Sequence, residues 1–243
     1  MNSLKISNLS FSYNRNSIDG YNVFKDSNLS VNNSRIIGLV GVNGCGKSTL
    51  LKLIKGDLPM QDGTIIIGNK SIENLQNVSF ITQQSIDNIF PKLTVFENYM
   101  LFHEKDIISY RNFDNPKNRQ LCVESIRKAG MNLEDRLDEQ VRFLSGGQQQ
   151  ALGIILACDA YSPILLMDEP TASLDVFIAE KILEIAISEI NDRDGLLIFT
   201  SHNLYDIIHY TEHIVVIKKG GDMFDVPNKE KDVDLIQLRN KMQ

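Results

Sequence analysis

The stretch IIGLVGVNGCGKSTLLKLI, from Ile36 to Ile54, determines how the rest of this chain is interpreted. Its first five residues form a short apolar run, which is typical of a strand buried on both faces. The segment GVNGCGKST follows at Gly41–Thr49, and leucine and isoleucine then recur at helical spacing. A glycine-rich loop therefore joins a buried strand to the start of a helix, and this context predicts a phosphate-binding loop.

Each part of this loop suits a nucleoside triphosphate. The glycines Gly41, Gly44 and Gly46 allow backbone N–H groups to turn towards phosphate oxygens. The helix that begins near Lys47 adds the positive end of its dipole. Lys47 would place a positive charge on the terminal phosphates, and Ser48 would offer a hydroxyl to Mg²⁺. We therefore predict that the chain binds a nucleoside triphosphate; the alternative is a glycine turn with an exposed lysine.

The composition of the 243 residues fits one sizeable core with a smaller subdomain. The net charge is −6 and the pI is about 5.3, so the overall charge does not favour a nucleic-acid partner. No apolar run approaches the roughly 18 residues of a membrane span, which predicts a cytosolic protein that meets a membrane only through a partner. Cys45, Cys122 and Cys158 lack the spacing of a disulfide framework or zinc site, and Cys45 is interpreted as a small loop residue.

Periodicity along the chain predicts an α/β fold. Polar and apolar residues alternate over residues 1–40, as in an antiparallel sheet with turns. Two buried strands are expected at residues 164–167 and 196–199, with an amphipathic helix between them, and this alternation favours a parallel sheet. Residues 91–158 favour helices instead, and we expect them to form an inserted lobe. Further strands are expected at residues 64–67 and 78–81.

Two patterns support helices within this lobe. Thr94 and Glu97 have the spacing of a capping box at a helix start. A second helix has one apolar face, which Gly130 can terminate. The residues expected on that face are Leu121, Cys122, Ile126 and Ala129.

An acidic pair, Asp168 and Glu169, directly follows the predicted strand at residues 164–167. The carboxyl end of a buried parallel strand borders the ligand crevice. Asp168 would therefore hold Mg²⁺, directly or through water, and Glu169 would polarise the water that attacks the terminal phosphate. Without a phosphate loop in the same chain, this pair would be interpreted as a solvated strand end.

The sequence LSGGQ, at Leu144–Gln148, has two interpretations. Ser145 and Gln148 form a capping-box pattern, which would mark an ordinary helix start. However, two adjacent glycines in the first turn of a helix cost about 1 kcal/mol each relative to alanine. They indicate that another group approaches the backbone closely. A serine hydroxyl beside a bare helix N-terminus then predicts a second anion site.

Taken together, these motifs resemble those of the ATPase subunit (nucleotide-binding domain) of ATP-binding cassette (ABC) transporters, over residues 4–220. By this resemblance GVNGCGKST is the Walker A loop, LSGGQ the signature motif, and ILLMDEP (Ile164–Pro170) the Walker B strand. ASLD, at Ala172–Asp175, resembles the D-loop. The implied fold is a P-loop NTPase (RecA-like) core with a parallel sheet, an N-terminal antiparallel β subdomain and an inserted α-helical subdomain.

The resemblance also implies individual roles. Lys47, Glu169 and His202 (the switch histidine) would be catalytic, and ATP and Mg²⁺ would be the cofactors. Ser48, Asp168 and Gln83 (the Q-loop glutamine) would hold Mg²⁺. Tyr13 would stack on adenine, and the remaining nucleotide contacts would come from Gly41, Asn43, Gly44, Cys45, Gly46, Lys47, Ser48, Thr49, Ser145, Gly147, Gln148 and Asp175.

The implied assembly contains two ATPase subunits and a transmembrane permease subunit. In a homodimer or heterodimer, Ser145 and Gly147 of one subunit would close over ATP held by Lys47 of the other. Gln83 and the lobe around residues 90–98 would contact the permease, which places the protein in the cytoplasm, peripheral on the inner face of the cell membrane. One ABC ATPase domain would span residues 1–243.

The parts of this domain are expected to have the following boundaries. Residues 1–90 and 159–225 would form the catalytic core with its β subdomain. Residues 91–158 would form the helical lobe, and residues 226–243 a C-terminal tail containing a short helix.

Two residues depart from the family pattern. Ala151 and Leu156 stand where the family usually has arginine, which raises the possibility of a deeply packed signature helix and a weakly hydrolysing regulatory subunit. A soluble cassette ATPase that acts in translation or DNA repair is another alternative, although such chains usually hold two cassettes or long coiled coils. A P-loop kinase or GTPase would leave LSGGQ unexplained.

Overall fold

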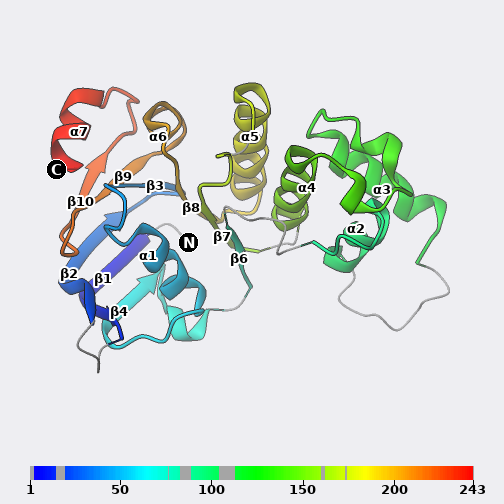
Figure 1. The fold of residues 1–243 in the computed structure, drawn as a ribbon. Helices are drawn as coiled ribbons and strands as arrows, with labels where there is room; N and C mark the ends of the chain where they lie inside the picture. The colour runs from blue at the N-terminus through cyan, green and yellow to red at the C-terminus, as the bar shows by residue number, and fades with distance from the viewer. Residues whose placement is uncertain are drawn as a thin grey trace.

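The computed structural model describes residues 3–14, 20–75, 77–82, 89–103, 113–159, 162–172 and 174–242. Figure 1 shows two groups of strands on one side and a helical lobe on the other. The strands are β1 (Ser3–Tyr13), β2 (Tyr21–Asn32), β3 (Ile36–Val40), β4 (Asp62–Ile67), β5 (Lys70–Ser71), β6 (Val78–Ile81), β7 (Ile164–Asp168), β8 (Leu196–Thr200), β9 (His213–Ile217) and β10 (Met223–Pro227). The α-helices are α1 (Lys47–Lys55), α2 (Val95–His103), α3 (Pro116–Arg127), α4 (Gly146–Asp159), α5 (Val176–Asp192), α6 (Leu204–Tyr210) and α7 (Leu235–Met242).

The strands form two sheets. The larger sheet has the order β10-β9-β3-β8-β7-β6, and all of its pairs are parallel except β9 with β10. The smaller sheet has the order β2-β1-β4-β5 and is antiparallel. The parallel sheet and the N-terminal antiparallel sheet therefore agree with the sequence prediction.

The sequence did not show which strands belong to which sheet. Residues 36–40 follow the antiparallel hairpin in the chain, but they form a central strand of the parallel sheet as β3. The expected strands at residues 64–67 and 78–81 also separate, because β4 pairs with β1 and β6 pairs with β7. Strand pairing depends on partners far along the chain, which local periodicity cannot identify.

Apolar side chains are buried in three clusters. The first lies between the antiparallel sheet, α1 and one face of the parallel sheet. The second lies between the opposite face of the parallel sheet and α4, α5, α6 and α7. The third holds the helical lobe together, where α2 and α3 pack against α4. Since β3 contributes to both of the first two clusters, all five of its residues are buried, as a strand covered on both faces requires.

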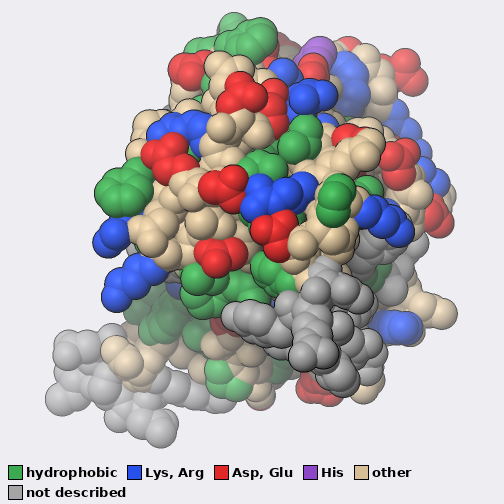
Figure 2. Space-filling view, turned by 90° about the vertical axis from the view of Figure 1, so that its right-hand side faces the viewer, with side chains coloured by type: hydrophobic (Ala, Val, Ile, Leu, Met, Phe, Trp, Pro, Cys, Tyr) green, Lys and Arg blue, Asp and Glu red, His purple; other side chains and the backbone are tan. Residues whose placement is uncertain are grey.

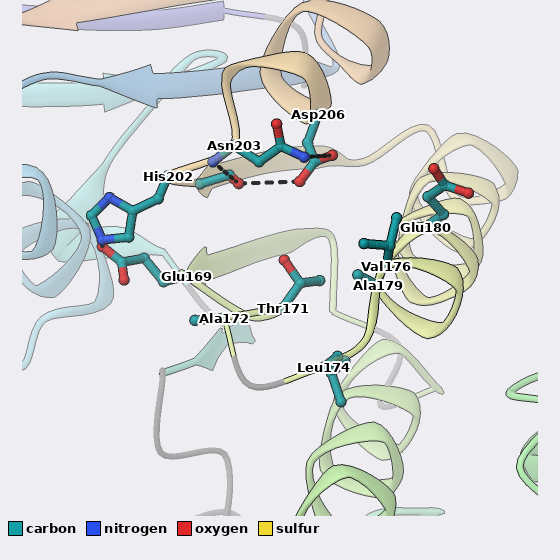
Figure 3. Close-up of a pocket in the computed structure, with 11 residues that line it drawn as sticks. Glu169, Thr171, Ala172, Leu174, Val176, Ala179, Glu180, His202, Asn203 and Asp206 are labelled. Atoms are coloured by element: carbon teal, nitrogen blue, oxygen red, sulfur yellow. Dashed lines mark hydrogen bonds and ion pairs between the residues drawn. The ribbon is translucent and has the colours of Figure 1, made fainter.

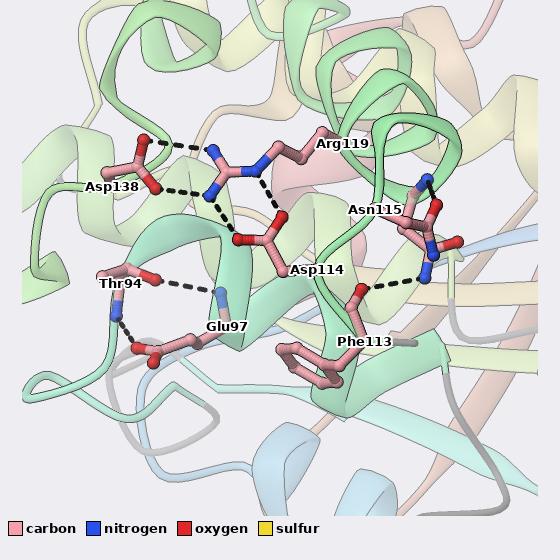
Figure 4. A network of polar contacts seen from close by, with 8 residues as sticks. Thr94, Glu97, Phe113, Asp114, Asn115, Arg119 and Asp138 are labelled. Carbon is pink, nitrogen blue, oxygen red and sulfur yellow. Dashed lines mark hydrogen bonds and ion pairs between the residues drawn. The ribbon is translucent and has the colours of Figure 1, made fainter. Parts of the chain in front are cut away.

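The helical lobe confirms one predicted pattern and corrects another. Thr94 and Glu97 form the capping box, because the Thr94 N–H donates to Glu97 Oε2 (2.7 Å) and the Glu97 N–H donates to Thr94 Oγ1 (3.1 Å). This pair and a nearby ionic network are drawn in Figure 4. In α3, Cys122 and Ile126 are buried as expected, but Leu121 is 45% exposed. The prediction for Leu121 was wrong, since it precedes Cys122 and points about 100° away around the helix.

The signature helix α4 lies between the two parts of the molecule. Ala151 faces the cluster shared with α5 and the parallel sheet, and Leu156 faces the core of the lobe. Both side chains are fully buried. The apolar residues at these two positions therefore pack α4 deeply, as one of the sequence interpretations proposed.

The C-terminal segment is docked on the core. Leu238 of α7 is 1% exposed and belongs to the second cluster. Asn228 is buried before this helix, and its side-chain amide donates to the carbonyl oxygens of Ile208 (2.7 Å) and Thr211 (3.0 Å) at the end of α6. The short helix expected within residues 226–243 is confirmed.

The face formed by the helical lobe is polar and mixed in charge. Figure 2 shows the face formed by the helical lobe, where acidic and basic side chains alternate and hydrophobic groups lie singly or in small patches. Among the described helices, none is long and apolar enough to cross a membrane.

Candidate nucleotide-binding site

The phosphate loop runs from the end of β3 to the start of α1. Gly46 precedes α1 with a φ of 112°, a left-handed conformation that favours glycine. A Cβ atom at Gly46 would also lie 2.7 Å from Val23 and 2.8 Å from Phe24. Gly46 is therefore required both by the backbone conformation and by the close approach of β2.

Lys47 begins α1 and is held over its own loop. Its ammonium group donates to the carbonyl oxygen of Gly41 at 2.8 Å and to that of Val42 at 3.4 Å. The side chain is 8% exposed. Its positive charge is thus held at one place, bonded to two loop carbonyls.

A cavity of about 440 Å³ opens beside this loop. Two tyrosines from the β1–β2 hairpin stand at its edge: the Tyr13 hydroxyl lies 3.3 Å from Thr49 Oγ1, and the Tyr21 hydroxyl donates to the Gly44 carbonyl (3.2 Å). The sequence pointed to Tyr13 alone, although Tyr21 begins the paired strand. The lining residues are Tyr13, Tyr21, Val23, Asn43, Gly44, Gly46, Lys47, Ser48, Thr49, Glu169 and His202.

Cys45 was expected among the nucleotide contacts, but its side chain points into the core between the sheets. Its backbone N–H donates to the Val42 carbonyl (3.2 Å). Burial raises the pKa of the Cys45 thiol, and the nearby positive charge of Lys47 offsets this only in part. The thiol is therefore kept neutral and away from the cavity.

Glu169 and His202 both line this cavity, and Figure 3 shows them side by side in the neighbouring pocket that they also line. The distance from His202 Nε2 to Glu169 Oε1 is 2.8 Å. Glu169 is a non-glycine residue with a φ of 52°. Its backbone N–H donates to Thr200 Oγ1 (2.8 Å), and the Thr200 hydroxyl donates to Asp168 Oδ1 (2.9 Å). Thr200, at the end of β8, thereby fixes both acidic residues.

The oxygen groups near the loop suit a hard cation. Ser48 supplies a hydroxyl at the start of α1, and Asp168 supplies a carboxylate at the end of β7. The described residues contain no group of three or more His, Cys, Asp or Glu side chains arranged for a metal ion. Mg²⁺ usually takes one or two protein ligands and completes its shell with phosphates and water, so these two residues fit it. Gln83 lies outside the described residues.

The LSGGQ segment forms the predicted capping box at the start of α4. Gln148 Oε1 accepts from the Ser145 N–H (3.1 Å), and the Gln148 N–H donates to Ser145 Oγ (3.3 Å). Gln148 Oε1 also accepts from Arg136 Nη1 (2.8 Å), and Nε2 donates to the Met131 carbonyl (3.2 Å). The side chain of Gln148 thus binds its own lobe, while Gly146 has open space where a Cβ would lie.

Asp175, also expected among the nucleotide contacts, caps a helix. Its carboxylate accepts from the Ile178 N–H at 3.0 Å, at the start of α5.

Comparison with known proteins decides the family. The model of the ABC transporter family matches residues 24–172, a range that contains the phosphate loop, LSGGQ and the Asp168–Glu169 pair. The chain belongs to this family. It is the ATP-binding and ATP-hydrolysing subunit of an ABC transporter.

Two relatives match this ABC ATPase over almost their full length. A tyrosine transport ATP-binding protein of Clostridioides difficile is 30% identical, and the match covers 94% of each chain. A probable ABC transporter ATP-binding protein of Mesomycoplasma hyorhinis is 31% identical, over 97% of this chain and 96% of its own. A solved dimeric bacterial ABC transporter cassette is 25% identical with a TM-score of 0.74, over 92% and 98% of the two chains.

Within one copy of this ABC ATPase, the cavity beside Lys47 and the LSGGQ segment are separate. The cavity beside Lys47 is lined by residues of the phosphate loop, the hairpin and the strand ends, but by none of the described residues 144–148. LSGGQ lies on the helical lobe and does not line this cavity.

Proposed function

We propose that two copies of this ABC ATPase pack head to tail and enclose two ATP molecules. The observation that supports this proposal is the separation of the phosphate loop from the LSGGQ segment within one chain. Lys47 and its loop form a cavity on one part of the chain, while Ser145 and Gly146 are exposed at the start of α4 on another, with open space beside Gly146. ATP bound to the first part of one copy would be covered by the second part of the other copy.

Each residue at the cavity then has a distinct role. Lys47 binds the terminal phosphates, Asn43, Gly44 and Gly46 provide backbone contacts, and Tyr13 stacks on the adenine ring. Ser48 and Asp168 hold Mg²⁺, which neutralises phosphate charge when bound; Gln83 is the third proposed ligand. These are the phosphate-loop roles expected of a P-loop ATPase.

Glu169 and His202 act on the hydrolytic step. Glu169 orients the attacking water and accepts its proton while the water oxygen bonds to the γ-phosphorus. The bond between that phosphorus and the oxygen of the leaving ADP breaks. His202, which contacts Glu169 in this structure, holds the γ-phosphate side of the site. Closure before hydrolysis and opening after it would then drive the transmembrane permease from the cytoplasmic side.

The helical lobe is the proposed contact with the permease. Phe90 is 56% exposed just before α2, and Phe143 is also exposed, within the 3₁₀ turn Val141–Phe143. The Arg142 N–H donates to the Pro91 carbonyl at 2.9 Å, which brings the two segments together. Exposed aromatic side chains on a fixed turn fit a protein interface.

Size-exclusion chromatography with and without Mg-ATP tests the dimer. The Glu169→Gln variant is expected to elute as a dimer only with Mg-ATP. It should bind ATP but hydrolyse it so slowly that the two subunits stay together. Wild-type protein is expected to hydrolyse ATP and elute as a monomer. Adding Lys47→Ala to Glu169→Gln should abolish the shift.

Glu180→Gln is the matched control. Glu180 lies on α5 and, together with Glu169, lines the pocket drawn in Figure 3. This variant should behave as wild type. If Glu169→Gln binds ATP and stays monomeric, self-pairing is wrong, and a different second subunit is required.

A further inference from the structure

A buried hydrogen bond connects the signature helix to the turn that carries Glu169. Gln150, in the second turn of α4, donates from Nε2 to the Pro170 carbonyl oxygen at 2.6 Å. The Gln150 side chain is 4% exposed, and Pro170 is buried as well. Because both partners are out of water, this contact has a defined geometry and no solvent substitute.

The turn that receives this bond is under conformational strain. Glu169 has a φ of 52°, in the left-handed region that non-glycine residues avoid. The next residue is Pro170, and a proline restricts the backbone of the residue before it. Such a conformation persists only where surrounding contacts determine it.

Among the described residues, three contacts from other elements of the chain hold this turn. The Glu169 N–H donates to Thr200, and the Glu169 carboxylate contacts His202. Gln150 binds the carbonyl just beyond Glu169. The first two contacts come from the catalytic core, whereas the third comes from the signature helix.

Much of the remaining packing of α4 is apolar. Ala151 and Leu156 are fully buried in apolar clusters. Apolar contacts are not directional, so they allow small rotations and shifts of a helix that a hydrogen bond resists. The amide of Gln150 therefore fixes the position of α4 relative to the catalytic turn.

We propose that Gln150 is a positioning residue that links LSGGQ to the Glu169 of its own chain. Gln150 lies four residues after Gly146, which is about 6 Å along the helix axis. In the proposed dimer, LSGGQ touches the ATP of the other subunit. A displacement of α4 at that ATP is transmitted through Gln150 to Pro170 and Glu169, so each subunit senses the nucleotide of its partner.

This inference rests on the proposed role of Glu169, and steady-state ATP hydrolysis tests it. Gln150→Met keeps the size of the side chain and removes the donor. We expect kcat to fall about tenfold while the KM for ATP changes less than twofold, because the cavity is intact. The matched control is Gln149→Met on the same helix, where the amide donates to the nearby Leu144 carbonyl (3.0 Å) instead of to the catalytic turn. That variant should keep its kcat within twofold of wild type.

A double-mutant comparison separates positioning from general loss of structure. In the Glu169→Gln background, Gln150→Met should reduce the residual hydrolysis by less than twofold and leave the ATP-dependent dimer unchanged. Gln150→Asn keeps the amide but is one methylene too short, so it should lose kcat as Gln150→Met does. If the Gln150→Met variant does not fold, the Gln150→Asn variant is used for the same comparison.

The outcomes distinguish this inference from the proposed function. If Glu169→Gln leaves hydrolysis intact, the role of Glu169 is wrong. If Glu169→Gln strongly reduces hydrolysis while both Gln150 variants retain wild-type kcat, only the positioning role fails. Equal losses from Gln150→Met in the two backgrounds, or a raised KM with unchanged kcat, would also overturn it.

Discussion

At the scale of single residues, Cys45 shows that a place in a binding loop does not define a role. The residue stands between Gly44 and Gly46, but its side chain is buried among core residues and its backbone N–H serves the loop itself. The three cysteines all lie in the described part of the chain, and all three are buried. The loop thus uses Cys45 as a small core residue.

We predict that Cys45 resists alkylation in the folded protein. Burial raises the pKa of its thiol, so the reactive thiolate is scarce at pH 7–8 and increases only at a more alkaline pH than for a free cysteine. N-ethylmaleimide at pH 7.5 should leave the native protein unlabelled by mass spectrometry. Unfolding in guanidinium should expose all three thiols. Rapid native labelling at Cys45 would contradict the buried position.

The sequence placed the ends of β3, β7 and β8 correctly around one cavity, because carboxyl ends of parallel strands meet at one sheet edge. The positions of Lys47, Glu169 and His202 follow from that rule. The contacts of Gln150 could not be foreseen. Its partner, Pro170, is 20 residues away along the chain, and nothing in the local pattern around α4 indicates which turn it meets.

At the scale of elements, an ionic network anchors α3 to the rest of the lobe. Figure 4 shows Arg119 between two carboxylates. Its guanidinium donates from Nε to Asp114 (2.5 Å) and from Nη2 to Asp138 (2.8 Å), and it lies 4.9 Å from the centre of the Phe96 ring. Hydrogen bonds from Arg119 hold the pKa values of both carboxyls below their usual range.

Arg119→Met is expected to lower the Tm of the protein by about 2–4 °C at pH 7, since the network is largely exposed but also packs on an aromatic ring. Carboxyl groups with a lowered folded-state pKa stabilise the fold above their unfolded pKa, about 4, and lose this effect as pH falls. The Tm difference should therefore shrink below pH 4. Differential scanning calorimetry measures it.

Arg127→Met is the control on the same helix, because the Arg127 side chain is 64% exposed and its ion pair with Glu134 has an N–O distance of 3.5 Å. Its Tm should stay close to that of wild type at every pH. A Tm difference for Arg119→Met that is constant from pH 7 to pH 3 would show that the carboxylates contribute nothing.

At the scale of the whole molecule, α7 closes one side of the core beside the site. A cavity of about 320 Å³ lies between this helix and the loops at the sheet edge. Leu235, Arg239 and Met242 of α7 line it together with Gly41 and His202. The C-terminal helix is therefore a structural neighbour of the catalytic loops rather than a separate tail.

Leu238→Ala is predicted to destabilise the protein by about 3 kcal/mol, since it leaves a cavity in the second cluster. Ile236→Ala on the same helix should change stability little, because Ile236 is 69% exposed. Urea unfolding followed by circular dichroism compares them. Equal midpoints for the two variants would show that α7 is not docked in solution.

The order of the parallel sheet has a consequence for synthesis of the chain. The strand before the phosphate loop, β3, pairs only with β8 and β9 among the described strands, and these begin at residues 196 and 213. The hairpin of β1 and β2 can form from neighbouring residues, but β3 must wait for partners translated much later. Most of the chain is therefore translated before the nucleotide-binding site can form. Nascent chains stalled before residue 196 should therefore fail to retain ATP, and nucleotide cannot stabilise β3 during that interval.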